Sequence, residues 1–123
     1  MKTLKAISDA MNALEINYAF KKWKGKPKYP YFIGEYQERE NPNEDGMTEK
    51  QFILTGFARG EEAIAELEST KERIKEYFPQ DSGRLAIVDG SAVVIFYASA
   101  FGNLKTGDAE LEKIQINLNT QVT

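Results

Sequence analysis

The chain contains neither cysteine nor histidine among its 123 residues. Without cysteine it can form no disulfide, no thiolate zinc site and no cysteine nucleophile. Without histidine it lacks the commonest general base near neutral pH and the commonest transition-metal ligand, and it cannot form a Ser-His-Asp triad. We therefore expect a protein that is not an enzyme, with no catalytic residue, no cofactor and no metal site.

Long apolar runs are also missing. The longest, such as AVVIFYASAF, are too short to cross a bilayer as a helix. The first residues include lysines, but Ser8, Asp9 and Asn12 interrupt the apolar core that a secretory signal needs. We expect no membrane association, and a chain that stays in the cytoplasm where it is made. The length and the 41% hydrophobic content suit one globular domain spanning residues 1–123.

Charge is distributed unevenly along the chain. Residues 1–34 carry seven lysines against Asp9 and Glu15, a net charge of +5, whereas residues 35–123 carry a net charge of −8, which together give the overall −3. If folding keeps these groups apart, each copy has opposite charged surfaces, which favours head-to-tail contacts between copies. Folding can equally intermix the charges.

Two segments have apolar residues at the three- and four-residue steps of an amphipathic helix. Near the start of the chain these residues are Leu4, Ile7, Met11 and Leu14. In GEEAIAELESTKERIKEYFP they are Ile64, Leu67, Ile74 and Phe78. Pro79 follows the second pattern and predicts the end of that helix.

The remaining segments are rich in β-forming residues. INYAFKKWKGKPKYP predicts a short strand followed by an extended loop. YFIGEYQERE and EKQFILTGFA predict a long hairpin, and a second hairpin is predicted where RLAIV and SAVVIFYASA flank an Asp-Gly turn. ELEKIQINLNTQV alternates between apolar and polar residues, which predicts a strand with one solvated face. The order favours an α+β fold, in which a mostly antiparallel β-sheet with a long projecting hairpin is packed on one face by two α-helices.

Three groups of residues around the long hairpin are candidates for a role. The apolar group is predicted to form core or hairpin base: Tyr29, Tyr31, Phe32, Ile33, Phe52, Ile53 and Leu54. The acidic group is Glu38, Glu40, Glu44, Asp45 and Glu49, with Glu35 before it and Arg39 and Lys50 among it. It could hold a hard cation, but its spacing matches no EF-hand loop, and a solvated hairpin tip is the simpler interpretation.

The basic group is interleaved with Trp23, Tyr29 and Tyr31, and consists of Lys21, Lys22, Lys24, Lys26 and Lys28. Such a combination could neutralise phosphates and stack bases. The negative net charge and the lack of an RNP, KH or helix-turn-helix pattern argue against nucleic-acid binding. Lysines on a strand edge often serve to prevent sheet aggregation.

Taken in order, YPYFIGEY, EDGM, QFILTGFARG, AELESTKERIKEYF, VVIFY and TGDAELEKIQINL resemble a group of small virion proteins from tailed phages and prophages of Gram-positive bacteria. These are the tail-terminator or tail-completion proteins of the neck, where tail and head meet. The resemblance covers about 100 positions and its motifs are not catalytic. It implies a phage virion structural protein that self-assembles into a homo-oligomeric ring, usually a hexamer. The ring would dock to the tail-tube protein and the head-completion connector.

The resemblance also implies a location and an interface. The protein would occur in the host cytoplasm during assembly and then in the tail or neck of the virion. Contacts between copies would use the projecting arm, with Glu38, Arg39, Glu40, Glu44, Asp45 and Glu49, and a complementary surface with Lys21, Lys22, Lys24 and Lys26. The final strand is expected at a sheet edge, free to pair across a subunit boundary. The alternatives are a nucleic-acid-binding accessory phage protein and a small metal-dependent hydrolase.

Overall fold

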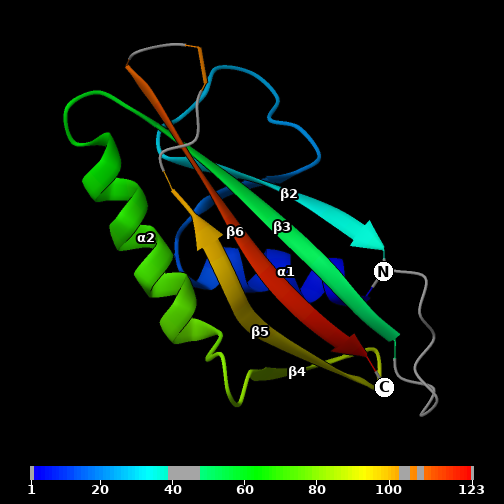
Figure 1. Cartoon of the computed structure of the whole chain (residues 1–123). Coiled ribbons are helices and arrows are strands. Elements are labelled where there is room, and N and C mark those ends of the chain that lie inside the picture. The colour runs from blue at the N-terminus through cyan, green and yellow to red at the C-terminus, as the bar shows by residue number, and fades with distance from the viewer. Residues whose placement is uncertain (1, 39–47, 103–105, 108–109, 123) are drawn as a thin grey trace.

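The computed structural model describes residues 2–38, 48–102, 106–107 and 110–122 (Figure 1). Described residues form two helices and six strands. In chain order these are α1 (Lys2–Ala13), β1 (Asn17–Phe20), β2 (Tyr31–Glu38), β3 (Thr48–Arg59), α2 (Ala63–Tyr77), β4 (Arg84–Val88), β5 (Ser91–Phe101) and β6 (Leu111–Val122). The predicted α+β class is confirmed.

The strands form one sheet in the order β1-β2-β3-β6-β5-β4. Only β1 and β2 run parallel, and every other neighbouring pair is antiparallel. Both predicted hairpins form, β2 with β3 and β4 with β5. The expectation of a free final strand is wrong, because β6 lies in the middle of the sheet and pairs with β3 on one side and β5 on the other. The strands at the two edges are β1 and β4.

Both helices contribute to one hydrophobic core against a single face of the sheet. Helix α1 contacts β1, β4 and β5, and lies behind the sheet in Figure 1, whereas α2 contacts β3, β5 and β6. Ile7 and Met11 of α1 and Ile74 of α2 are completely buried in the same cluster. Alternate residues of the strands fill the rest of it, including Leu54 and Ile116. The other face of the sheet has no helix on it among the described residues.

The predicted apolar stripe of α2 is confirmed at Leu67, Ile74 and Phe78, but not at Ile64. The buried stripe within the helix differs at its start. It consists of Ala63, Leu67, Thr70 and Ile74, whereas Ile64 is 52% exposed. Consecutive helical residues are about 100° apart, so Ala63 and Ile64 cannot both lie on the centre of the stripe. The small Ala63 faces the core, and the larger Ile64 lies in solvent.

The β2–β3 hairpin packs phenylalanine rings directly on glycine backbone. Phe32 is paired with Gly56, and an added Cβ at Gly56 would lie 2.3 Å from Cε2 of Phe32. A Cβ at Gly34 would lie 2.4 Å from Cζ of Phe52. Both rings are buried. Each glycine thus leaves the space that a core phenylalanine of the neighbouring strand occupies.

The residues predicted to form the core or the hairpin base differ in burial, because successive residues of a strand point to opposite faces of the sheet. Phe32, Phe52 and Leu54 are buried, whereas Tyr31 and Ile33 are only half-buried because they lie on the opposite face of the sheet. The group predicted as core or hairpin base therefore divides between two faces.

Strand β6 alternates as predicted, with one exception on its polar face. Asn117 is only 6% exposed. Its Nδ2 donates a hydrogen bond to Oγ of Ser99 at 3.0 Å, and its Oδ1 accepts one from Nε2 of Gln115 at 3.1 Å. Asn119 on the same face is exposed, so burial is local to Asn117, which lies opposite Ser99 next to the irregularity in β5 between Tyr97 and Ser99.

Replacing Gly56 with alanine is expected to destabilise the fold by about 1–3 kcal/mol, because the new methyl group would force the Phe32 ring out of its position. Gly102→Ala is the matched control, since a Cβ there would meet its nearest neighbour, Oε1 of Glu68, at an ordinary 3.6 Å. Urea unfolding of both variants measures the difference. Equal stabilities would contradict the packing described for the hairpin.

Tyr18 is expected to make stability fall at high pH. Its hydroxyl is buried without a hydrogen-bond partner among the described residues, and burial, followed by the nearby Tyr36, raises its pKa from 10.0 to about 12. Below pH 10 Tyr18 is protonated in both the folded and the unfolded chain, so its contribution to the free energy of unfolding is fully present. As the pH rises from 10 to 12 the unfolded chain loses its proton first, and stability is lost, at about 1.4 kcal/mol per unit of pKa difference.

The measurement is the free energy of unfolding of the wild type and of Tyr18→Phe at about pH 9 and about pH 11.5. The variant should become more stable relative to the wild type at the higher pH, because phenylalanine has no proton to lose. An unchanged difference between the two proteins would show that Tyr18 does not titrate this way.

Candidate functional site

The basic segment forms the loop between β1 and β2, and hydrogen bonds hold both of its ends. Lys21 has a φ of 70°, and its backbone N–H donates to the carbonyl of Gly34 at 2.9 Å. At the other end, Nδ2 of Asn17 donates to the carbonyls of Lys28 and Pro30 at 3.1 and 3.2 Å. The loop is therefore attached to the sheet at each end.

Four aromatic rings gather where this loop meets the sheet, and we call them the aromatic patch: Trp23, Tyr29, Tyr31 and Phe57. Tyr31 lies at its centre, with ring centroids at 5.2 Å from Trp23, 5.5 Å from Tyr29 and 5.1 Å from Phe57. Nε1 of Trp23 donates to the carbonyl of Lys26 at 3.0 Å, which fixes the indole. Burial, followed by the neighbouring Tyr29, raises the pKa of Tyr31.

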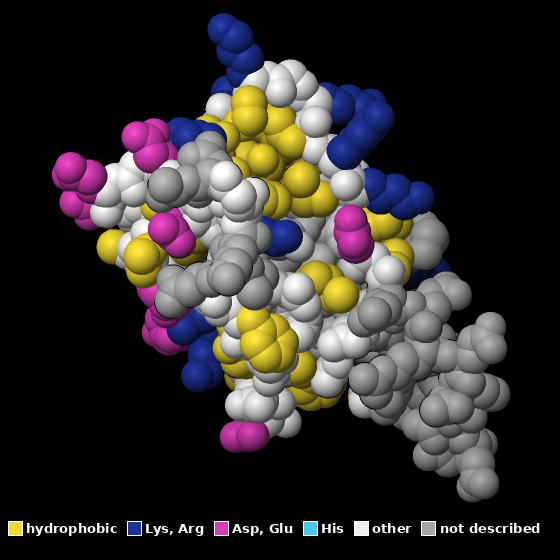
Figure 2. Space-filling model, turned by 45° about the horizontal axis from the view of Figure 1, so that its top comes forward, with side chains coloured by type: hydrophobic (Ala, Val, Ile, Leu, Met, Phe, Trp, Pro, Cys, Tyr) yellow, Lys and Arg dark blue, Asp and Glu magenta, His cyan; other side chains and the backbone are white. Residues whose placement is uncertain are grey.

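Two cations lie over rings of the aromatic patch, and five lysines lie in the adjoining loop, where Nζ of Lys21 lies 5.6 Å from the ring centroid of Phe20. We call all seven the basic rim: Lys21, Lys22, Lys24, Lys26, Lys28, Arg59 and Lys113. Cζ of Arg59 lies 5.7 Å from the Tyr29 ring centroid, and Nζ of Lys113 lies 5.9 Å from that of Phe57. The five loop lysines are all exposed. Figure 2, turned so that this end of the molecule comes forward, shows apolar side chains bordered by Lys and Arg in its upper part. Such a surface offers stacking, cation–π contacts and electrostatic attraction to a partner.

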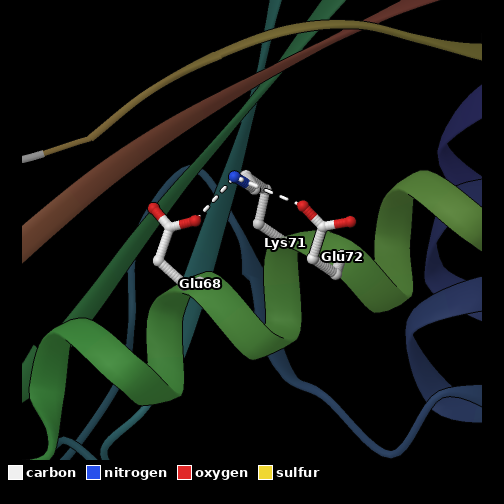
Figure 3. Close-up of polar contacts among 3 residues, drawn as sticks. All are labelled: Glu68, Lys71 and Glu72. Atoms are coloured by element: carbon white, nitrogen blue, oxygen red, sulfur yellow. Dashed lines mark hydrogen bonds and ion pairs between the residues drawn. The ribbon is translucent and has the colours of Figure 1, made fainter.

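The loop lysines differ from Lys71 on α2, which is already neutralised within the chain. Nζ of Lys71 lies 2.6 Å from Oε2 of Glu68 and 3.5 Å from Oε1 of Glu72 (Figure 3). The hydrogen bond to Glu68 is the main cause of a raised Lys71 pKa. No loop lysine has an ion pair with a carboxylate among the described residues. Their charge is thus available for contacts outside the chain.

The projecting arm of the predicted interface, which contains five carboxylates and Arg39, is only partly described. Arg39, Glu40, Glu44 and Asp45 lie outside the described residues. The backbone places Glu38 at the end of β2 and Glu49 near the start of β3. Strand β2 begins directly after the basic loop, so the loop and Glu38 lie at opposite ends of this strand, about 25 Å apart for eight residues. Within the part of the chain that the structure describes, the basic loop therefore lies far from Glu38.

Sequence reasoning missed three members of this surface. Phe57, Arg59 and Lys113 belong to β3 and β6, far from the loop in sequence. Phe57 is paired with Tyr31 in β2 and with Lys113 in β6, so the three form one row across the sheet. The residue alternation of EKQFILTGFARG could have placed Phe57 and Arg59 on one face, but only the strand order reveals their neighbours.

The described part of the chain contains no cluster of three or more Asp or Glu side chains arranged to hold a metal ion. The cation-binding alternative for the acidic group concerns residues mostly outside this part. Neither described helix has the length and apolar character needed to cross a membrane.

No protein-family model matches this chain, and no curated protein matches it. Chains of solved structures do match it. One of these, whose name contains no functional term, aligns over 99% of this chain and 91% of its own length, with a TM-score of 0.65 and 15% sequence identity. At this identity the likeness shows a shared fold and nothing about activity or partners.

Tyr31→Ala is expected to shift the fluorescence emission of Trp23 to longer wavelength, because loss of the neighbouring ring exposes the indole to water. Trp23 is the single tryptophan of the chain, so the signal reports this patch alone. Tyr77→Ala, far from the loop on α2, is the control and should leave the emission maximum unchanged. Identical spectra for Tyr31→Ala and the wild type would contradict the contact.

Proposed function

We propose that this chain is a virion structural protein of the tail-terminator type, located at the head–tail junction of a tailed phage. Its motifs resemble that family, and the α+β fold agrees with the one that the resemblance implies. The observation that supports it best is the position of the basic loop and of Glu38 at opposite ends of β2. The protein acts by assembling into a ring, and not by transforming a substrate.

Separation of the two charged groups favours contacts between copies over contacts within one. The distance of about 25 Å between the basic loop and Glu38 exceeds the Debye length of about 8 Å at physiological ionic strength, so charges at these two positions interact little within a chain. Between neighbouring copies, the loop lysines of one can meet the acidic arm of the next. Such a contact joins two different surfaces, and repeated rotation closes it into a ring.

A ring of this kind, a hexamer in its assembled form, has two faces for docking. One contacts the tail-tube protein, and the other contacts the head-completion connector. The protein would be made in the host cytoplasm and end in the neck of the virion. The exposed aromatic patch gives each copy a rigid apolar surface within a basic rim, a combination that suits protein docking.

A nucleic-acid-binding accessory protein is the second candidate, and the aromatic patch is the observation that favours it. Trp23 is half-buried and Tyr29 is 36% exposed, and both lie beside loop lysines. Bases of a single strand stack on such rings while lysines neutralise phosphates. A ring that acts by docking to other proteins would not need this contact, so the two candidates differ in their DNA affinity.

The test of the ring is charge reversal. Lys21→Glu combined with Lys22→Glu should raise the protein concentration needed for half assembly at least tenfold, about 1.4 kcal/mol of association free energy. The acidic arm would then face like charges. Glu38→Lys with Glu40→Lys should have the same effect, and a mixture of the two variants should assemble again. Light scattering and electron microscopy at high protein concentration measure the assembly of each variant and of the mixture.

Lys75→Glu on α2 is the control and should assemble like the wild type, because this exposed lysine lies outside both charged groups. Added salt should weaken wild-type assembly. Rings that resist both salt and reversal would refute the charge pairing. A chain that never forms rings but retains single-stranded DNA in a salt-dependent way would favour the second candidate.

A further inference from the structure

Strand β4 is a free sheet edge with an apolar surface. It pairs with β5 on one side and is the last strand in the sheet order. Leu85 is 60% exposed and Ile87 is 68% exposed, the two highest values among the exposed large hydrophobic residues that the structure describes. Both lie on the open face of the sheet, opposite Val94 and Ala92 of β5. Exposed apolar edges of this kind pair readily with another strand unless something protects them.

A groove of about 200 Å³ borders this edge. Ala6, Asp9 and Ala10 of α1 line one side of it, and Tyr77 lies at the end of α2. The β4 side is lined by residues from both faces of the strand, Ala86 and Ile87 among them, so the groove lies along the edge itself. A strand added to β4 would have space for its side chains on the helix side.

The sequence of this edge is self-complementary only when two copies run antiparallel. It begins with Arg84, continues with four apolar residues, and is followed by Asp89. Antiparallel pairing centred on Ala86 sets Leu85 opposite Ile87 of the second copy, and Arg84, which stacks on Tyr77 of its own chain, opposite Val88 and one residue from Asp89 of the second copy. Parallel pairing would instead set like charges together at both ends, which is unfavourable.

We propose that β4 is the docking site for β4 of a second copy of this chain, in an antiparallel pair related by a two-fold axis at Ala86. The two sheets then become one continuous sheet. Four exposed apolar side chains, Leu85 and Ile87 from each copy, cover one another on the open face, and the positive Arg84 end of each strand lies near the negative Asp89 end of the other. In a two-fold contact each residue pair occurs twice, so one apolar strand with opposite charges at its ends is sufficient.

This contact is separate from the proposed ring. In the ring, the basic loop before β2 of one copy meets the acidic arm after β2 of the next copy. The β4 pair uses a different part of the sheet, the edge strand β4. Leu85→Lys should therefore leave ring contacts intact, and reversal of Lys21 and Lys22 should leave the β4 pair intact. Failure of one inference does not carry over to the other.

The experiment measures the mass of the purified full chain by light scattering and sedimentation over a range of concentrations. Wild type should reach twice the mass of one chain in conditions of high salt, where the exposed charge contacts of the ring are weakened. Leu85→Lys should halve that mass, because two lysines would meet the apolar cluster. Ile64→Lys is the matched control: Ile64 is another exposed hydrophobic residue, on α2, and its replacement should leave the dimer unchanged.

A cysteine tests the register, since the chain has none of its own. Ala86→Cys would meet itself across the two-fold axis at a separation suited to a disulfide, and oxidation should give a covalent dimer. Ser69→Cys, exposed on α2, is the control and should remain uncross-linked. A wild type that stays a monomer at every concentration would overturn the proposal. So would a dimer that survives Leu85→Lys or one that Ala86→Cys does not cross-link.

Discussion

The packing of phenylalanine on glycine between β2 and β3 sets the register of the hairpin from which the candidate surface is built. Phe32 rests on Gly56 and Phe52 on Gly34, so each strand supplies a ring and a vacant site for the other. A shift by one residue would place rings against side chains and move the core face into solvent. The basic loop leads into the start of β2, and Glu38 is the last residue of this strand. The fixed register therefore also fixes how Tyr31 and Phe57, at the loop end of the hairpin, lie opposite each other.

Local patterns in the sequence predict the elements well, because each depends on neighbouring residues. The stripe of Ile7 and Met11 identifies α1, and the Asp89-Gly90 pair, with φ values of 50° and 80°, forms the tight turn that joins β4 to β5. Strand order is a different matter. Nothing in the alternation of β6 tells that it lies between β3 and β5, because an edge strand with one solvated face has the same pattern.

The same distinction applies to the candidate surface. The basic segment and its aromatic residues are continuous in sequence, so the grouping of Trp23 with Tyr31 follows from their positions in the chain. Phe57 and Lys113 join them only because β3 lies between β2 and β6. Asn117 is a related case, since a polar residue on the solvated side of a strand became buried once neighbours enclosed it. Long-range pairing brings these residues together, whereas the local sequence alone places only those that are neighbours in the chain.

The central position of β6 has a consequence for the order in which the protein can fold. Strands β1, β2 and β3 form one group and β4 and β5 another, and among the described strands β6, the last of the six in chain order, is the one that joins them. A growing polypeptide on the ribosome would hold two incomplete sheets until residues 111–122 emerge. Because this closure links positions far apart in sequence, we expect folding to be slow for the size of the protein and to finish only after those residues leave the exit tunnel.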